Sequence, residues 1–237
     1  MDQFNLLSLI FLVYLFVLFP RAALRSARVV RQTVEAGVPL PRTRVLLSTL
    51  FTLLVTFMMA WVNAQAMGRD LWAVDWSLRN IALGVVAFIV LLGAIPLSRR
   101  LRTPEELRRQ LLNGIVPRNN QEMGLFTLAA IGAGIAEEAA YRGVAVWLLT
   151  LVFGAPIPAI LMSTMAFAVA HAVQGGKSMA IVAGVALLFH GLVTLTGTLV
   201  IAMIVHAAYD IVAGIAARKK ADELERSAGQ QPGANVP

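Results

Sequence analysis

The stretch Glu-Glu-Ala-Ala-Tyr-Arg-Gly at residues 137–143 decides the fold, because it places three charged side chains inside an apolar run from about 125 to 153. Each charge at the centre of a membrane helix costs about 2.5–3.5 kcal/mol. In a helix, Glu138 and Arg142 share one face with the acid first, which favours an ion pair. Glu137 is turned about 100° away from that face. An unpaired carboxylate in apolar surroundings is a candidate for acid–base chemistry.

Composition places this stretch in a membrane protein. The chain has 237 residues, of which 58% are hydrophobic and 14% charged, and its mean hydropathy is +0.75. Soluble domains carry about 25% charged residues. We therefore predict an all-α polytopic bundle of about seven to eight transmembrane helices. The sequence contains no Cys, which excludes a disulfide framework and a thiolate metal site.

The apolar segments predict how the chain is divided. The third of the predicted spans ends near residue 97, the last ends at 217, and a polar tail follows that we expect to be disordered and cytoplasmic. The run 121–153 would be about 50 Å long as one helix, against a hydrocarbon core of about 30 Å. We therefore expect a kink near Gly132 or Gly134, or an eighth span. The predicted spans are 4–19, 45–67, 80–97, 121–153, 157–173, 178–195 and 198–217.

Basic residues predict the orientation. All of the 20 Lys and Arg residues except Arg69, Arg79 and Arg142 lie in segments expected on one side of the membrane. The positive-inside rule makes that side cytoplasmic, with the N-terminus outside, and it explains the basic composition without nucleic acid. We expect the first span to end at Pro20 and the basic segment 21–31 to lie on the membrane surface.

A short connecting helix is expected on the cytoplasmic side. Thr103, Pro104 and Glu106 form a capping box that predicts a helix reaching about Leu112.

Further polar residues interrupt the later spans. Phe167 and His171 are four residues apart near the end of one span, and His206 and Asp210 are four apart on the last. Each alone is most simply a helix–helix contact, and so is His190, which matches no motif. Burying so many charged and imidazole groups in one bundle is expensive unless they form a site.

Three motifs carry a family resemblance. Glu137-Glu138-x-x-x-Arg142, Phe167-x-x-x-His171 and His206-x-x-x-Asp210 follow one another on consecutive predicted membrane helices. This order resembles the CPBP family, the CAAX-protease and bacteriocin-processing membrane proteins, also called the Abi family. The resemblance covers about residues 100–217, so we expect three N-terminal helices over 1–97, a catalytic core over 98–217 and the tail 218–237.

The resemblance implies an intramembrane glutamic endopeptidase. We also predict that the protein is located in the plasma membrane. Glu137 would activate water, His171 would hold that water, and His206 with residue 210 would stabilise the oxyanion. Glu138 and Arg142 would brace the helix. The chain departs from the family at Asp210, where Asn is commoner and can donate a hydrogen bond. Tyr141, next to Arg142, stands where Phe is common.

Other functions remain open from the sequence. We expect no cofactor, but a zinc peptidase using Glu137, His171, His206 and Asp210 is an alternative. A proton-coupled transporter would also bury acids and histidines, and a non-catalytic scaffold or immunity protein would use the fold for binding. The expected partners are the lipid bilayer and a peptide or protein substrate, lipidated or membrane-embedded, and no nucleic acid.

Overall fold

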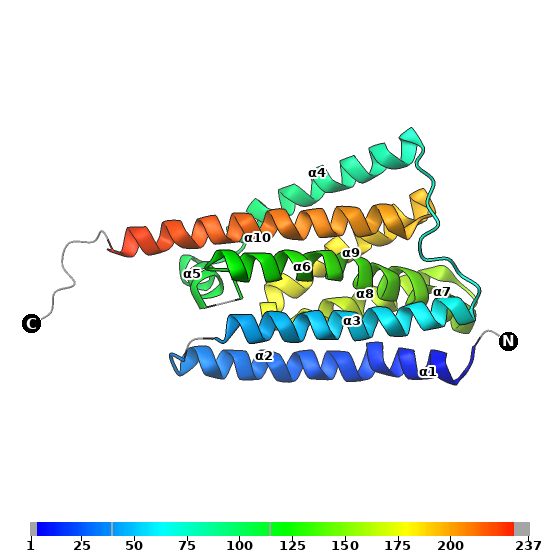
Figure 1. Ribbon diagram of the computed structural model, residues 1–237, viewed down its shortest axis with the longest axis horizontal. Helices are drawn as coiled ribbons and strands as arrows, with labels where there is room; N and C mark the ends of the chain where they lie inside the picture. The colour runs from blue at the N-terminus through cyan, green and yellow to red at the C-terminus, as the bar shows by residue number, and fades with distance from the viewer. Residues whose placement is uncertain (1–3, 39, 114, 230–237) are drawn as a thin grey trace, which may run out of the picture.

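The structure is a computed structural model that describes residues 4–38, 40–113 and 115–229, and these residues form helices and connecting loops without strands. Figure 1 shows long helices lying side by side in one bundle. Within the described residues, six helices are long and apolar enough to cross a membrane, and Pro156–Ala170 is a shorter apolar helix. The predicted all-α polytopic bundle is therefore confirmed.

The first helix does not end at Pro20. Helix α1 (Leu6–Val13) continues through a π-helical turn, η1 (Tyr14–Leu18), into α2 (Phe19–Glu35). Proline lacks an N–H and its ring collides with the preceding turn of an α-helix. The wider π turn, in which the Phe19 N–H donates to the Tyr14 carbonyl, lets the helix pass Pro20. The basic segment 21–31 therefore extends the first helix along its axis, contrary to our expectation of a separate surface segment (Figure 1).

Two helices and a loop complete the N-terminal part. Helix α3 (Arg42–Ala66) and helix α4 (Leu78–Arg100) are joined by an extended loop. Asn80 fixes this loop to the segment around Thr196. Its amide donates to the Asp75 carboxylate at 3.1 Å and to the Thr196 carbonyl at 3.2 Å. The Thr198 hydroxyl donates to the Ala73 carbonyl at 2.7 Å.

The predicted capping box is present at the start of α5 (Pro104–Asn113). The Thr103 N–H donates to the Glu106 carboxylate at 2.9 Å, and the Glu106 N–H donates to the Thr103 hydroxyl at 3.2 Å. The Lys177 ammonium forms a 2.8 Å ion pair with Glu106. These contacts tie α5 to the beginning of α9 (Gly176–Thr196).

The expected disordered tail is wrong for residues 218–229. Helix α10 spans Leu199–Gly229, and its last turns pack against α5. Ala221 is fully buried there with Leu111 and Val116. This apolar contact stabilises helical turns that a polar composition alone would leave unsupported. Residues 230–237 of the predicted tail lie outside the described residues.

The motif-bearing run is interrupted at the motif itself. Helix α6 (Asn120–Glu137) is followed by the π-helical turn η2 (Glu138–Val144) and by α7 (Ala145–Phe153). The expected kink at Gly132 or Gly134 is therefore wrong in position. Gly134 instead allows α6 to approach α10, since a Cβ there would lie 2.6 Å from the Met203 carbonyl oxygen. Figure 1 shows α6 and α10 side by side.

A short helix brings the second motif into the bundle. Helix α8 spans only Pro156–Ala170 and ends at His171, and one 3₁₀ turn, η3 (Ala172–Gln174), leads into α9. The Pro156 ring is compatible with the first turn of a helix. The Ser163 hydroxyl donates to the Tyr141 carbonyl at 2.7 Å, which fixes α8 to η2. All three motifs thus belong to neighbouring elements.

Candidate active site

Glu138 is the buried centre of the polar cluster. Its side chain and that of Arg142 have no exposed surface, and the Arg142 Nη1 lies 3.2 Å from the Glu138 Oε1. The predicted pair is therefore present, within the π-helical turn. A buried ion pair needs further hydrogen bonds to offset the desolvation of both charges. Glu138 obtains one from another helix, because the His206 Nδ1 lies 2.7 Å from the same Oε1.

His206 links the two neighbouring glutamates. A carboxylate only accepts hydrogen bonds, so the His206 Nδ1 is the donor to Glu138. The other ring nitrogen, Nε2, lies 3.8 Å from the Glu137 Oε2 and 3.5 Å from the Asp210 Oδ2. The imidazole is held on one side and presents its second nitrogen to two carboxylates.

Glu137 differs from Glu138 in accessibility. The exposed fraction of its side chain is 17%, against 0% for Glu138. It lies within electrostatic range of His171, His206, Asp210 and Arg142. The residues that sequence analysis selected on three separate helices therefore lie in one region of the bundle, in which the Glu137 carboxylate is partly exposed.

His171 is oriented by its own helix. Its Nδ1 lies 2.8 Å from the Phe167 carbonyl oxygen, which can only accept, so Nδ1 is the donor. The imidazole and the Phe167 ring are 4.5 Å apart between centroids. This arrangement leaves the His171 Nε2 free to accept a proton or to hold a water molecule.

Aromatic rings support the buried guanidinium. Arg142 lies 4.1 Å from the Phe167 ring centroid and 5.5 Å from that of Phe189, both within cation–π range. The Phe189 ring also stacks on the His206 imidazole at 5.2 Å. The Tyr141 ring meets Phe167 edge to face at 4.9 Å. Phe167 thus supports both Arg142 and His171, which explains its place in the second motif.

Sequence analysis missed two features of this cluster. The bond between Glu138 and His206 joins residues 68 positions apart and leaves no local sequence signal. Phe189 is an apolar residue in an apolar helix, so nothing in its sequence context distinguishes it from a packing residue. The role expected for Glu138, a brace for its own helix, omitted its bond to His206.

The donor set was tested against the zinc alternative. Among the described residues, no group of three or more His, Asp and Glu side chains is arranged to hold a metal ion. The Nδ1 of His206 donates to Glu138 and that of His171 to a backbone carbonyl, which leaves the Nε2 of each ring as the nitrogen that a metal could bind. What speaks against zinc is the spacing of the four side chains as arranged here.

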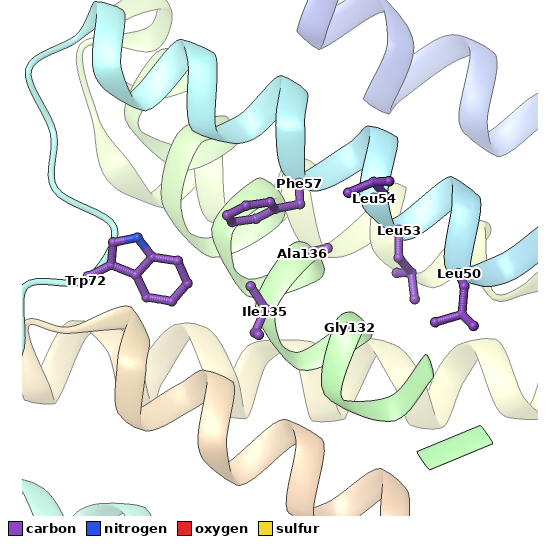
Figure 2. A pocket seen from close by; sticks show the side chains of 8 residues that line it. All are labelled: Leu50, Leu53, Leu54, Phe57, Trp72, Gly132, Ile135 and Ala136. Atoms are coloured by element: carbon purple, nitrogen blue, oxygen red, sulfur yellow. The ribbon is translucent and has the colours of Figure 1, made fainter. Parts of the chain in front are cut away.

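An apolar groove is lined in part by the two residues that precede Glu137 in the chain. Figure 2 shows it between α3 and α6, with a volume of about 310 Å³. Ile135 and Ala136 of its lining directly precede Glu137 on α6. The lining residues are Leu50, Leu53, Leu54, Phe57, Trp72, Gly132, Ile135 and Ala136.

The comparison with known families agrees with this geometry. Residues 119–212 match a family model described as "Type II CAAX prenyl endopeptidase Rce1-like". No curated protein and no solved structure matches the chain significantly. The matched range contains all three motifs and the helices that bring them together. The resemblance indicated by the motifs is therefore confirmed, because residues 119–212 are similar to the Rce1-like type II CAAX prenyl endopeptidases.

Proposed function

We propose that this membrane endopeptidase hydrolyses a peptide bond with a water molecule that Glu137 activates. One observation carries the proposal. Of two adjacent glutamates, Glu138 is fully buried and held by Arg142 and His206, whereas Glu137 is accessible and faces the His206 Nε2 at 3.8 Å. A general base needs a free carboxylate within reach of a water molecule, and of the two glutamates Glu137 meets that condition.

The reaction then proceeds in two proton transfers. Glu137 takes a proton from water while the water oxygen attacks the carbonyl carbon of the substrate. The resulting tetrahedral intermediate carries a negative oxygen. Glu137 returns the proton to the leaving nitrogen, the carbon–nitrogen bond breaks, and the products are a carboxylate and an amine. His171 holds the water through its free Nε2, because its Nδ1 is bonded to the Phe167 carbonyl.

In this mechanism His206 supplies the positive charge that stabilises the negative oxygen of the intermediate. As an imidazolium it gives one N–H to Glu138 and keeps the Nε2–H for the oxyanion. A donor fixed in advance is the most effective way to stabilise an oxyanion, and the 2.7 Å bond to Glu138 provides that fixation.

Asp210 has a different role from the one expected for residue 210. Its Oδ2 lies 3.5 Å from the His206 Nε2 and its side chain is 33% exposed. An ionised carboxylate would repel an oxyanion, so direct stabilisation is not its role. In our proposal it balances the charge of the imidazolium and helps to aim Nε2.

We propose a substrate that carries an apolar chain next to the cleaved bond. The groove between α3 and α6 gives such a chain an apolar surface, part of which is formed by the two residues that precede Glu137 (Figure 2). The name of the matching family refers to prenylated CAAX sequences, which have this character. From the distribution of Arg and Lys we further propose a plasma-membrane location with a cytoplasmic C-terminus.

The test is a cleavage assay with purified protein in lipid nanodiscs. The wild type should cleave a farnesylated Cys-aliphatic-aliphatic-X peptide faster than the same peptide without the lipid. Glu137→Gln should lower the rate by about 10²–10⁴-fold, the usual contribution of a general base. The control is Glu105→Gln, which alters an exposed glutamate of α5. Full cleavage by the Glu137→Gln variant would contradict the proposal, and loss of wild-type activity on chelation would favour the zinc alternative.

A further inference from the structure

His190 is a buried histidine with no part in the reaction proposed above. It lies on α9 with an exposed fraction of 5%, so it does not face lipid. Its neighbour Phe189 contacts both His206 and Arg142. His190 is therefore next in the chain to a residue that packs on the polar cluster.

Several buried polar atoms of His190 and of the polar cluster lack a hydrogen-bond partner among the described residues. Within the described part of the chain, the His190 Nε2, the Glu138 Oε2 and the Arg142 Nε and Nη2 are buried and have no hydrogen-bond partner. A buried polar group without a partner costs about 1–3 kcal/mol. Such groups in proteins are usually satisfied by ordered water when protein atoms do not reach them.

The unsatisfied atoms are chemically complementary. Glu138 offers an acceptor, Arg142 offers donors, and an imidazole nitrogen serves as either. Helix α9, which carries His190, also packs against η2, which carries Glu138 and Arg142. Both charged groups act electrostatically on His190.

We propose that His190 is a positioning residue, which binds the free oxygen of Glu138 through a buried water molecule and so fixes the carboxylate that holds His206. The chain of contacts runs from α9 to Glu138 on η2, and from there to His206 on α10. Its catalytic consequence rests on the proposed function, because it matters for cleavage only if His206 acts in the reaction.

The chain is well suited to a direct test, because it contains three histidines. Labelling them with ¹⁵N gives imidazole signals for His171, His190 and His206 alone, which single replacements assign. The test variants are His190→Leu, which removes the polar nitrogen, and His190→Gln, which retains a donor and an acceptor at similar reach.

We expect His190→Leu to shift the His206 signals, to leave the His171 signals in place, and to lower kcat about tenfold with KM unchanged. His190→Gln should restore the His206 signals and bring kcat to within about threefold of the wild type. Unshifted His206 signals in His190→Leu, or equal losses in both variants, would overturn the proposal.

A reciprocal variant keeps the test decisive if His190→Leu does not fold. Glu138→Gln should then shift the signals of both His190 and His206, and an unshifted His190 would overturn the link. The spectra also separate this proposal from the proposed function. If Glu137→Gln still cleaves while His190→Leu shifts His206, the reaction mechanism fails and the positioning link stands.

Discussion

The two faces of the helix where α6 passes into η2 are built in opposite ways. On one face, Glu138 and Arg142 are fully buried, paired with each other, and surrounded by Phe167, Phe189 and His206. On the other, Glu137 is partly exposed, and its contact with the His206 Nε2 is a looser 3.8 Å.

This difference teaches how adjacent identical residues acquire different roles. A carboxylate whose charge is already stabilised by an ion pair and a hydrogen bond is a poor base. A carboxylate that lies near imidazoles without a direct hydrogen bond to them remains reactive. In our proposal the closed face fixes the geometry, and the open face performs the chemistry. Four changes test this division, beginning with the largest expected effect.

Glu138→Gln attacks the closed face directly. It leaves Arg142 buried without its counter-charge, and breaking a buried pair in this way costs about 3–5 kcal/mol. We expect a large fall in the unfolding midpoint in nanodiscs together with loss of cleavage. Glu137→Gln should lose cleavage while its midpoint stays near that of the wild type. Similar midpoints for the two variants would remove the distinction between the faces.

Gly134→Ala tests the packing that brings the third motif to the closed face. The added Cβ would lie 2.6 Å from the Met203 carbonyl oxygen and 3.0 Å from the Ala207 Cβ, so α6 and α10 must separate. Overpacking of this kind costs about 1–3 kcal/mol.

Gly124→Ala is the matched control on the same helix, because nothing lies within 4 Å of its added Cβ and it does not line the groove. We expect Gly134→Ala to lower cleavage at least tenfold, and the control to stay close to the wild type in the same assay. Equal activities would show that the approach of the two helices does not set the position of His206.

Asp210→Asn changes the open face. The Asp210 oxygen shares the His206 Nε2 with Glu137, and an amide could donate to an oxyanion where a carboxylate cannot. We expect kcat to remain within about tenfold of the wild type, a change of about 1.4 kcal/mol or less in the activation barrier. A loss as large as that of Glu137→Gln would mean that Asp210 itself takes part in proton transfer.

Glu106→Gln is the smallest change and concerns a carboxylate remote from both faces. Hydrogen bonds from the Lys177 ammonium and the Thr103 N–H lower the pKa of Glu106. A carboxyl group whose pKa is lower in the folded state stabilises the protein above its unfolded pKa, and this contribution disappears as pH falls through the folded value.

The wild type should therefore unfold at a slightly higher temperature than Glu106→Gln at pH 7, and the difference should vanish on acidification below the folded pKa of Glu106. Cleavage should be unaffected at pH 7. A difference that grows on acidification would have the wrong sign for this contact.

Much of the site was predictable from residue spacing. The residues of the motif pairs Glu138–Arg142 and His206–Asp210 are each four positions apart on a helix. Charged residues within apolar spans are also easy to recognise in the sequence. Contacts between distant helices were not predictable in this way. The bond from His206 to Glu138 and the support of Arg142 by Phe189 depend on helix packing that no local pattern encodes.

The errors in the fold prediction have the same origin. Pro20 was expected to end a helix, because an isolated proline does so, but a π turn accommodates it. The polar segment after residue 217 was expected to be disordered, yet the contact of Ala221 with α5 extends the helix. Local propensity was correct in each case and tertiary contacts overrode it.

The central claim, that Glu137 activates water and does not itself bond to the substrate, can be tested in a single turnover in H₂¹⁸O. Mass spectrometry of the product and of the enzyme peptide containing Glu137 locates the new oxygen. The account predicts one ¹⁸O atom in the new carboxylate of the product and none in Glu137. An ¹⁸O atom in the Glu137 carboxylate would show a covalent intermediate and contradict the account.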